Sequence, residues 1–112
     1  MNFINTKDGN VCIVALSGRL DSNGSIEVEA HCRGLIECGD LRQLLDMTNV
    51  AYISSAGLRS LLVITKQIKS SGGMLALCCL TPMVSEVMKY SGFDKILTLL
   101  ADRDSALARF NS

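Results

Sequence analysis

The fold is decided by the stretch Asp46-Met-Thr-Asn-Val-Ala-Tyr-Ile-Ser-Ser-Ala-Gly-Leu-Arg-Ser-Leu-Leu62. An apolar strand is expected to end in a short polar turn, and two adjacent serines and a glycine then lead into a helix. The first amides of a helix lack partners inside it, and with the helix dipole they stabilise an anion placed there. A serine hydroxyl at this point either caps the helix or carries a phosphate. The choice separates an ordinary small domain from a switch.

Length and composition predict one domain over residues 1–112, large enough to bury about 65% of the surface of its unfolded chain. The chain is 48% apolar, and its 11 basic residues balance 11 acidic ones. This charge balance gives no basic patch for nucleic acid or for an anionic membrane. No apolar run approaches the roughly 20 residues that span a bilayer, and the first residues lack the form of a signal peptide. We therefore expect a cytoplasmic protein with no nucleic-acid partner and no membrane insertion.

The chain contains five cysteines without a Cys-x-x-Cys pair: Cys12, Cys32, Cys38, Cys78 and Cys79. The first and the last two lie in apolar runs, where a thiol behaves as a small buried hydrophobic group. His31 stands beside one cysteine and seven residues before another, which is a weak ligand spacing for zinc. We interpret His31 as a surface helix residue and expect no metal and no cofactor.

Strand and helix patterns alternate along the sequence. Strands are expected at residues 3–6, 11–16, 41–48, 74–80 and 96–99, with an Asp8-Gly9 hairpin turn between the first two. Helices are expected at about residues 23–38, capped by Ser22 or Asn23 and closed by Gly39, and at 55–70, 82–91 and 102–110. The alternation predicts an α/β fold with a mixed, mostly parallel sheet of about four to five strands and about four helices.

In such a sheet, functional sites gather at the carboxyl ends of the strands, where the turns at Asp21 and at Ser54-Ser55 are both expected. Asp21 and Asp46 are interpreted as a turn-forming and a hydrogen-bonding carboxylate. They are not read as an acid–base pair, because neither a histidine nor a nucleophile–base pair accompanies them. We expect no enzyme.

The helix at 55–70 has a clear core stripe at 3.6 residues per turn: Leu58, Leu61, Ile64 and Ile68. Val63 is expected on the opposite, exposed face with Arg59 and Lys66. An isolated exposed valine is common. Beside a candidate phosphoacceptor, however, the strip formed by these three residues is the predicted docking surface for a partner.

At these residues the chain resembles a STAS domain of the bacterial anti-sigma factor antagonist type. Gly18-Arg-Leu-Asp21 matches the motif after the family's first apolar strand, and Asp46-Met-Thr48 matches the Asp-x-Ser/Thr of the next strand. Ile53-Ser-Ser-Ala-Gly-Leu58 stands where the family has Asp-Ser-Ser-Gly-Leu. Gly72-Gly73 and the helix-opening Pro82 also fit. The resemblance covers essentially the whole chain in order and spacing.

The resemblance implies a partner-switching regulator of transcription. In this family an anti-sigma factor that is itself a serine kinase phosphorylates the serine after the family's Asp, and a serine phosphatase reverses the step. The unphosphorylated form binds the anti-sigma factor and frees the sigma factor. By position the acceptor is Ser55. Together with the strip on the helix at 55–70, the predicted partner surface comprises Asp21, Ser54, Ser55, Arg59, Val63 and Lys66.

Two departures from the family motif leave alternatives open. Ser54 occupies the place of the family's Asp, and Ala56 that of its second serine. Ser54 could therefore be the modified residue, or neither serine could be. The alternative function is a STAS module that binds a nucleotide or another small ligand, or that scaffolds a transporter or signalling complex without phosphorylation.

Overall fold

The chain opens with the hairpin that Asp8-Gly9 predicts. In the computed structural model, which describes residues 1–111, strand β1 (Asn2–Asp8) pairs antiparallel with β2 (Val11–Leu20). Gly9 adopts the left-handed φ of 61° that the tight turn requires. The N-terminal part of the chain is therefore organised by local turn chemistry.

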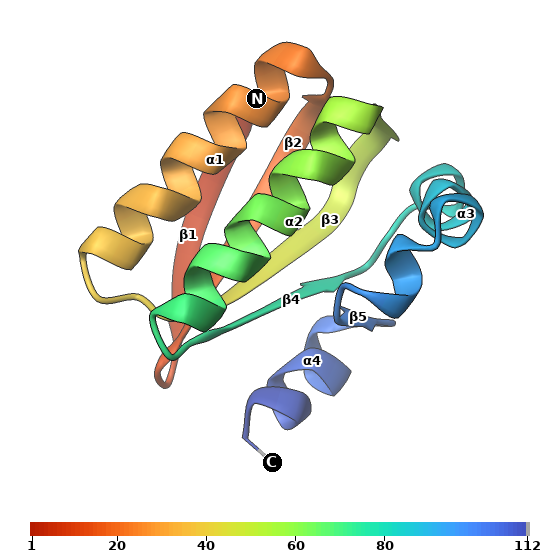
Figure 1. Cartoon of the computed structure of the whole chain (residues 1–112). Helices are drawn as coiled ribbons and strands as arrows, with labels where there is room; N and C mark the ends of the chain where they lie inside the picture. Colours follow the sequence, from red (N-terminus) through yellow and green to blue (C-terminus); the bar gives the residue numbers. More distant parts are fainter. Residues whose placement is uncertain (112) are drawn as a thin grey trace.

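The rest of the chain alternates strands with helices (Figure 1). The remaining strands are β3 (Arg42–Ile53), β4 (Met74–Cys78) and β5 (Leu99–Leu100). The helices are α1 (Ser22–Glu37), α2 (Ser55–Ser70), α3 (Pro82–Ser91) and α4 (Arg103–Phe110), with a short 3-10 turn at Phe93–Lys95. The sheet order is β1-β2-β3-β4-β5, and every pair after the first is parallel. The described residues thus confirm the predicted mixed sheet with four helices.

The two faces of the sheet are covered by different helices. Alternate side chains such as Val14, Leu45 and Leu77 form the main core with buried residues of α1, α2 and α3. The intervening side chains, including Ile13 and Leu44, pack against Ala106 and Phe110 of α4. In Figure 1, α1 and α2 lie side by side over the sheet, and α4 lies apart from them near β5.

Strand β3 is longer than the sequence predicts. The expected end at residue 48 is wrong, because β2 also continues to Leu20 and offers further backbone partners. Gly18 pairs with Val50 after one shift in register, and Leu20 pairs with Ile53 after a second shift. The exposed polar residues Thr48 and Asn49 therefore lie in an irregular part of a continuing strand rather than in a turn.

The last two strands differ from the prediction in the opposite sense. Strand β4 ends at Cys78 instead of residue 80, because Cys79 has a φ of 60° that a strand cannot accommodate. Strand β5 occupies residues 99–100 instead of 96–99. The 3-10 turn and the exposed Ile96 precede it, so the apolar pattern begins before the chain reaches the sheet.

The helices end as the sequence predicts, except that a different residue caps the N-terminus of α1. Asp21, rather than Ser22 or Asn23, caps α1, and its carboxylate accepts a hydrogen bond of 2.9 Å from the amide of Gly24. Gly39 follows this helix with a left-handed φ of 89°. Pro82 opens α3 as predicted. In residues 1–111 no helix is both long and apolar enough to cross a membrane.

Gly57 is predicted to be irreplaceable for packing reasons. A Cβ atom there would lie 2.6 Å from the backbone oxygen of Leu20. We expect Gly57→Ala to lower the free energy of unfolding by about 1–3 kcal/mol, as overpacking does. The control is Gly34→Ala within α1, where a Cβ meets nothing within 4 Å and a gain of roughly 0.4–1 kcal/mol is expected. Urea denaturation of both variants measures the difference, and equal stability of the two would contradict the packing argument.

Candidate functional site

The carboxyl ends of β2 and β3 bring together the two turns that the sequence singles out. Leu20 and Ile53 are paired at the ends of these strands. The amide of Ser54 donates a hydrogen bond of 3.0 Å to the backbone oxygen of Leu20. The start of α2 is therefore fixed directly beside the turn that contains Asp21.

Ser54 is the N-cap of α2. Its hydroxyl oxygen accepts a 3.2 Å hydrogen bond from the amide of Gly57 and donates a 3.1 Å bond to the carbonyl oxygen of Leu20. The first bond satisfies one of the free amides of the helix, and the second ties the cap to β2. The hydroxyl of Ser54 is thus committed to the fold.

Ser55 differs from its neighbour in both exposure and contacts. It is the first residue of α2, its side chain is exposed, and its hydroxyl has no hydrogen-bond partner within the described residues. The structure separates the two roles that the sequence left open at these serines. One hydroxyl caps the helix, and the other stands free at the helix N-terminus.

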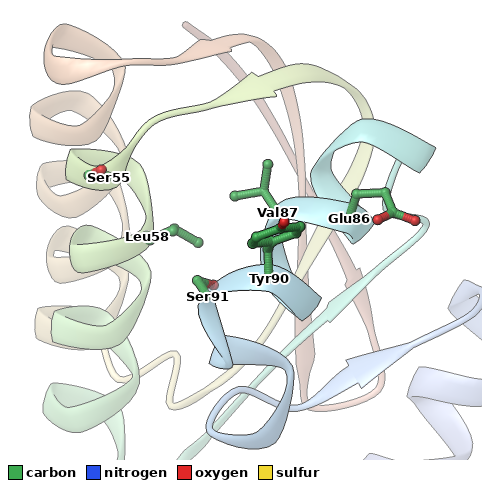
Figure 2. Close-up of a pocket in the computed structure, with 6 residues that line it drawn as sticks. All are labelled: Ser55, Leu58, Glu86, Val87, Tyr90 and Ser91. Atoms are coloured by element: carbon green, nitrogen blue, oxygen red, sulfur yellow. The ribbon is translucent and has the colours of Figure 1, made fainter.

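Ser55 also borders an open groove between α2 and α3 (Figure 2). The groove has a volume of about 360 Å³ and a largely apolar lining. Its walls are Ser55 and Leu58 from α2 and Glu86, Val87, Tyr90 and Ser91 from α3. Tyr90 is 94% exposed, so an aromatic side chain stands unburied beside the candidate acceptor. An apolar depression of this kind suits a side chain from a partner.

Sequence reasoning missed the α3 half of this groove. The residues Val84 and Met88 are the buried core positions of α3. Val87 and Tyr90 are spaced three residues apart, so they share a second face of the same helix. That spacing was a usable signal for a second apolar face, but nothing in the sequence indicates that the face lies opposite α2.

The predicted strip on α2 is only partly exposed. Arg59 and Lys66 are exposed, and neither forms an ion pair within the described part of the chain. Val63 is half-buried, so the expectation of a fully exposed valine is wrong. Val63 lies three residues after Ser60. The hydroxyl of Ser60 donates a hydrogen bond to the carboxylate of Glu29 on α1. Val63 therefore lies towards the α1 side of α2, where the neighbouring helix partly covers it.

Asp21 lies at the rim of the same end of the sheet. Its carboxylate caps α1, as described above, and its second oxygen lies 3.9 Å from the side-chain nitrogen Nε of Arg19. The guanidinium of Arg19 stacks 4.2 Å from the ring centre of Tyr52. Arg19 and Tyr52 were not singled out from the sequence, yet they place a cation and an aromatic ring near the carboxyl ends of β2 and β3.

Asp46 has a structural role on the face of the sheet that α4 covers. Its Oδ1 accepts 2.9 and 2.6 Å hydrogen bonds from the amide and hydroxyl of Thr48, and its Oδ2 lies 2.7 Å from Nε of Arg103. Burial raises the pKa of this carboxyl, but the bonds from Thr48 and Arg103 outweigh burial and leave the pKa below its ordinary value. Asp21 and Asp46 are each held by other partners, so the structure brings together no acid–base pair from them.

Known proteins resemble this chain in sequence. A model of the STAS domain family matches residues 2–106. BtrV of Bordetella bronchiseptica, named as an anti-sigma factor antagonist, is 36% identical over 112 residues, which are 100% of this chain and 97% of that protein. Its name describes a regulatory protein rather than an enzyme.

Solved structures share the fold. The crystal structure of the anti-sigma factor antagonist TM1081 of Thermotoga maritima gives a TM-score of 0.92 at 22% identity and covers 98% of this chain and 95% of that one. SpoIIAA of Bacillus has been solved in an unphosphorylated form, with a TM-score of 0.79 at 19% identity over 96% of this chain and 95% of that one. Its phosphorylated form gives 0.70 at 18% identity over 96% and 98%.

The two serines are predicted to respond differently to truncation. Ser54→Ala removes both hydrogen bonds of the cap, so we expect the free energy of unfolding to fall by about 0.5–2 kcal/mol. Ser55→Ala removes an exposed hydroxyl without a partner and should change it by less than about 0.5 kcal/mol. Chemical denaturation of the two variants under identical conditions measures the difference. A larger loss for Ser55→Ala would reverse the assignment of the cap.

Asp46 is predicted to make the free energy of unfolding depend on pH. Because its folded-state pKa lies below the unfolded value, the carboxylate stabilises the fold above the unfolded pKa, and this contribution is lost as pH falls through the folded pKa. Asp46→Asn should therefore be less stable than wild type at pH 7, and the gap should close at acidic pH. The control is Asp8→Asn at the exposed end of β1. Denaturation at a series of pH values tests this, and a gap independent of pH would contradict it.

Proposed function

We propose that this chain, which belongs to the STAS domain family and within it to the anti-sigma factor antagonists, is a switch controlled by phosphorylation of Ser55. In the unphosphorylated form it binds an anti-sigma factor that is also a serine kinase, and the sigma factor is freed. Transfer of phosphate from ATP to Ser55 releases the partner, and a serine phosphatase resets the cycle. The chain thereby regulates sigma-factor-dependent transcription in the cytoplasm of a bacterium.

The observation that carries the proposal is that the two adjacent serines have different contacts. The hydroxyl of Ser54 holds the helix N-terminus to Leu20, whereas the hydroxyl of Ser55 is exposed and unpartnered within the described residues. Only Ser55 can therefore be modified without removing a cap. Serine and aspartate are both favoured N-caps. Ser54 thus performs a role that suits the aspartate expected at this position, which accounts for the departure from the family motif.

The folded domain is suited to accept a phosphate at Ser55. A phosphoserine carries about −1.5 to −2 charge and three acceptor oxygens. At the first residue of α2 these oxygens lie near amides that have no partner within the helix, and near the positive end of its dipole. Arg59 lies one turn further on, where a guanidinium can reach an anion four residues before it. We therefore expect phosphorylation to leave the fold intact.

A docked partner is affected in the opposite way. The groove beside Ser55 is largely apolar, and Glu86 is one of its lining residues. A partner side chain that fills this groove would strip water from the phosphate, and removing a charge from water costs free energy unless the charge is paired. A penalty of about 3 kcal/mol weakens binding roughly a hundredfold, which is sufficient for a switch. The same modification is therefore favourable for the domain and unfavourable for the complex.

The proposal predicts opposite behaviour of two substitutions at Ser55. Baits carrying Ser55→Ala or Ser55→Asp are exposed to a lysate of the source organism, and bound proteins are identified by mass spectrometry. We expect only the alanine bait to retain an ATP-binding serine kinase. That kinase, once purified, should bind the phosphorylated protein about a hundredfold more weakly than Ser55→Ala, in line with the penalty of about 3 kcal/mol. The aspartate variant carries a single charge and should bind with an intermediate affinity.

Phosphate transfer then tests the acceptor itself. The purified kinase with labelled ATP should label the wild type but not Ser55→Ala. The matched control is Ser71→Ala, which removes an exposed serine at the other end of the same helix. Labelling of Ser55→Ala would refute Ser55 as the acceptor. Retention of the same proteins by both baits would favour the ligand-binding or scaffolding type of STAS module.

A further inference from the structure

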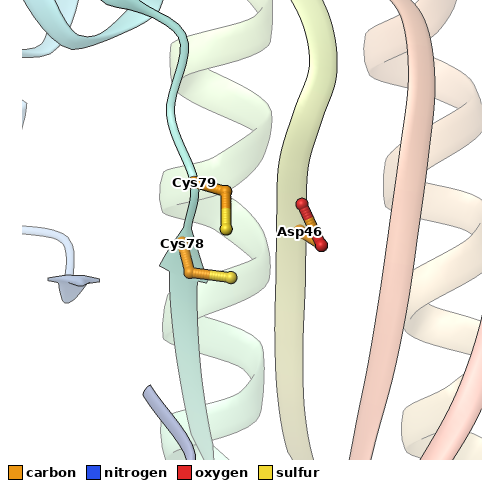
Figure 3. A group of neighbouring side chains, drawn as sticks. All are labelled: Asp46, Cys78 and Cys79. Carbon is orange, nitrogen blue, oxygen red and sulfur yellow. The ribbon is translucent and has the colours of Figure 1, made fainter. Parts of the chain in front are cut away.

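Two adjacent cysteines lie at the end of β4, on the sheet face covered by α4. Successive side chains of a regular strand point to opposite faces, so adjacent cysteines in a strand are expected to be separated. Cys78 is the last residue of β4, and Cys79 follows with a left-handed φ of 60°. It is the one residue other than glycine among those described that adopts a positive φ. Figure 3 shows the thiols of both cysteines directed towards Asp46 of the neighbouring strand.

We propose that Cys78, Cys79 and Asp46 bind a thiophilic divalent cation of the zinc class. The two sulfur atoms and one carboxylate oxygen all lie within 4.8 Å of one another. Asp46 is paired with Cys78 in the register of β3 and β4, so the sheet itself fixes two of the three donors. The third donor is brought to them by the unusual backbone conformation of Cys79.

The donor set suits such a cation. Zinc binds cysteine sulfur at about 2.3 Å and carboxylate oxygen at about 2.0–2.2 Å, commonly with three protein ligands and one open position. Tetrahedral geometry with these bond lengths separates the ligand atoms by roughly 3.5–3.8 Å. Because all three donors already lie within 4.8 Å of one another, they need to approach by about 1 Å at most. Cys79 lies outside the strand and is partly exposed, which gives it the freedom to make this movement.

The carboxylate of Asp46 is already oriented for a further ligand. Oδ1 accepts both hydrogen bonds from Thr48, while Oδ2 receives only the bond from Arg103 among the described residues. A carboxylate offers about four lone-pair sites, so Oδ2 retains one for a cation. Outer hydrogen bonds of this kind commonly hold the ligands of metal sites in place.

The charges also balance. Binding converts two thiols to thiolates and releases two protons, so that M²⁺ + 2 RSH gives M(SR)₂ + 2 H⁺. The two thiolates neutralise the cation, and Asp46 remains neutralised by Arg103 at 2.7 Å. No oxidant or reductant is needed. A buried site without net charge avoids the large desolvation cost of an isolated ion.

The other cysteines provide a contrast within the same chain. Cys12 and Cys32 are buried, and Cys38 is exposed after α1. His31 stacks on Phe3 at 4.1 Å between ring centres and contacts the side chain of Asn5 at 2.8 Å. Within residues 1–111 neither these cysteines nor His31 belong to a group of three closely spaced donors. The exposed Cys38 is therefore a built-in reference for non-specific thiol binding.

Metal titration of the full chain tests the site. Reduced, metal-free protein is titrated with Zn²⁺ against a chromophoric chelator, and with Cd²⁺ while thiolate-to-metal absorption is recorded. We expect saturation at one ion per chain. Cys79→Ser should weaken binding by more than the roughly 10–100-fold that follows loss of an outer hydrogen-bond partner of a ligand. Cys38→Ser should bind like wild type.

A second measurement uses the wild-type protein alone and does not depend on the folding of a variant. Alkylation of each cysteine is followed by mass spectrometry with and without one equivalent of Zn²⁺. We expect the ion to slow alkylation of Cys79 while Cys38 in the same molecule reacts at an unchanged rate. Equal rates at Cys79 with and without the ion, or unchanged affinity of Cys79→Ser, would overturn the proposal.

Discussion

The backbone oxygen of Leu20 accepts two hydrogen bonds from Ser54, one from its amide and one from its hydroxyl, and the functional end of the molecule depends on this contact. It joins the carboxyl end of β2 to the start of α2, although the two residues are 34 positions apart in the chain. Gly57 allows the approach, because any side chain there would collide with the same carbonyl. Once the cap is held in this way, the next residue of the helix must face outward, and Ser55 is that residue.

Local signals were sufficient for elements that local chemistry controls. The hairpin at Gly9, the bounds of α2 and the start of α3 at Pro82 all agree with turn and capping preferences read from the sequence. The strand ends could not be predicted in this way, because they are set by partners elsewhere in the chain. β3 continues to Ile53 because β2 runs beside it as far as Leu20. The partial burial of Val63 likewise could not be predicted, because the helical pattern within α2 places this residue opposite the core stripe.

The same distinction explains which parts of the sites escaped prediction. The groove beside Ser55 is formed by side chains from α2 and α3 whose separation in space is not encoded in either helix alone. The sequence did not reveal that the thiols of Cys78 and Cys79 lie on the same face of the sheet, for a different reason. An apolar run of strand-forming residues predicts alternating directions, and only the positive φ of Cys79 cancels that alternation. Sequence patterns describe the usual backbone, so they miss sites created by a departure from it.

Asp46 and Ser55 lie in opposite electrostatic environments, and this difference makes the proposed switch physically reasonable. The carboxylate of Asp46 is buried, and three hydrogen bonds fix it in place, two from Thr48 and one from the guanidinium of Arg103. Removal of its charge should therefore disturb the fold. Ser55 lies on the surface, where an added charge meets helix amides and solvent instead of a packed core. A charge that arrives there changes what the surface can bind and leaves the interior as it was. A regulatory protein of this size benefits from that separation, because a domain that unfolded on modification would have to refold before it could bind its partner again.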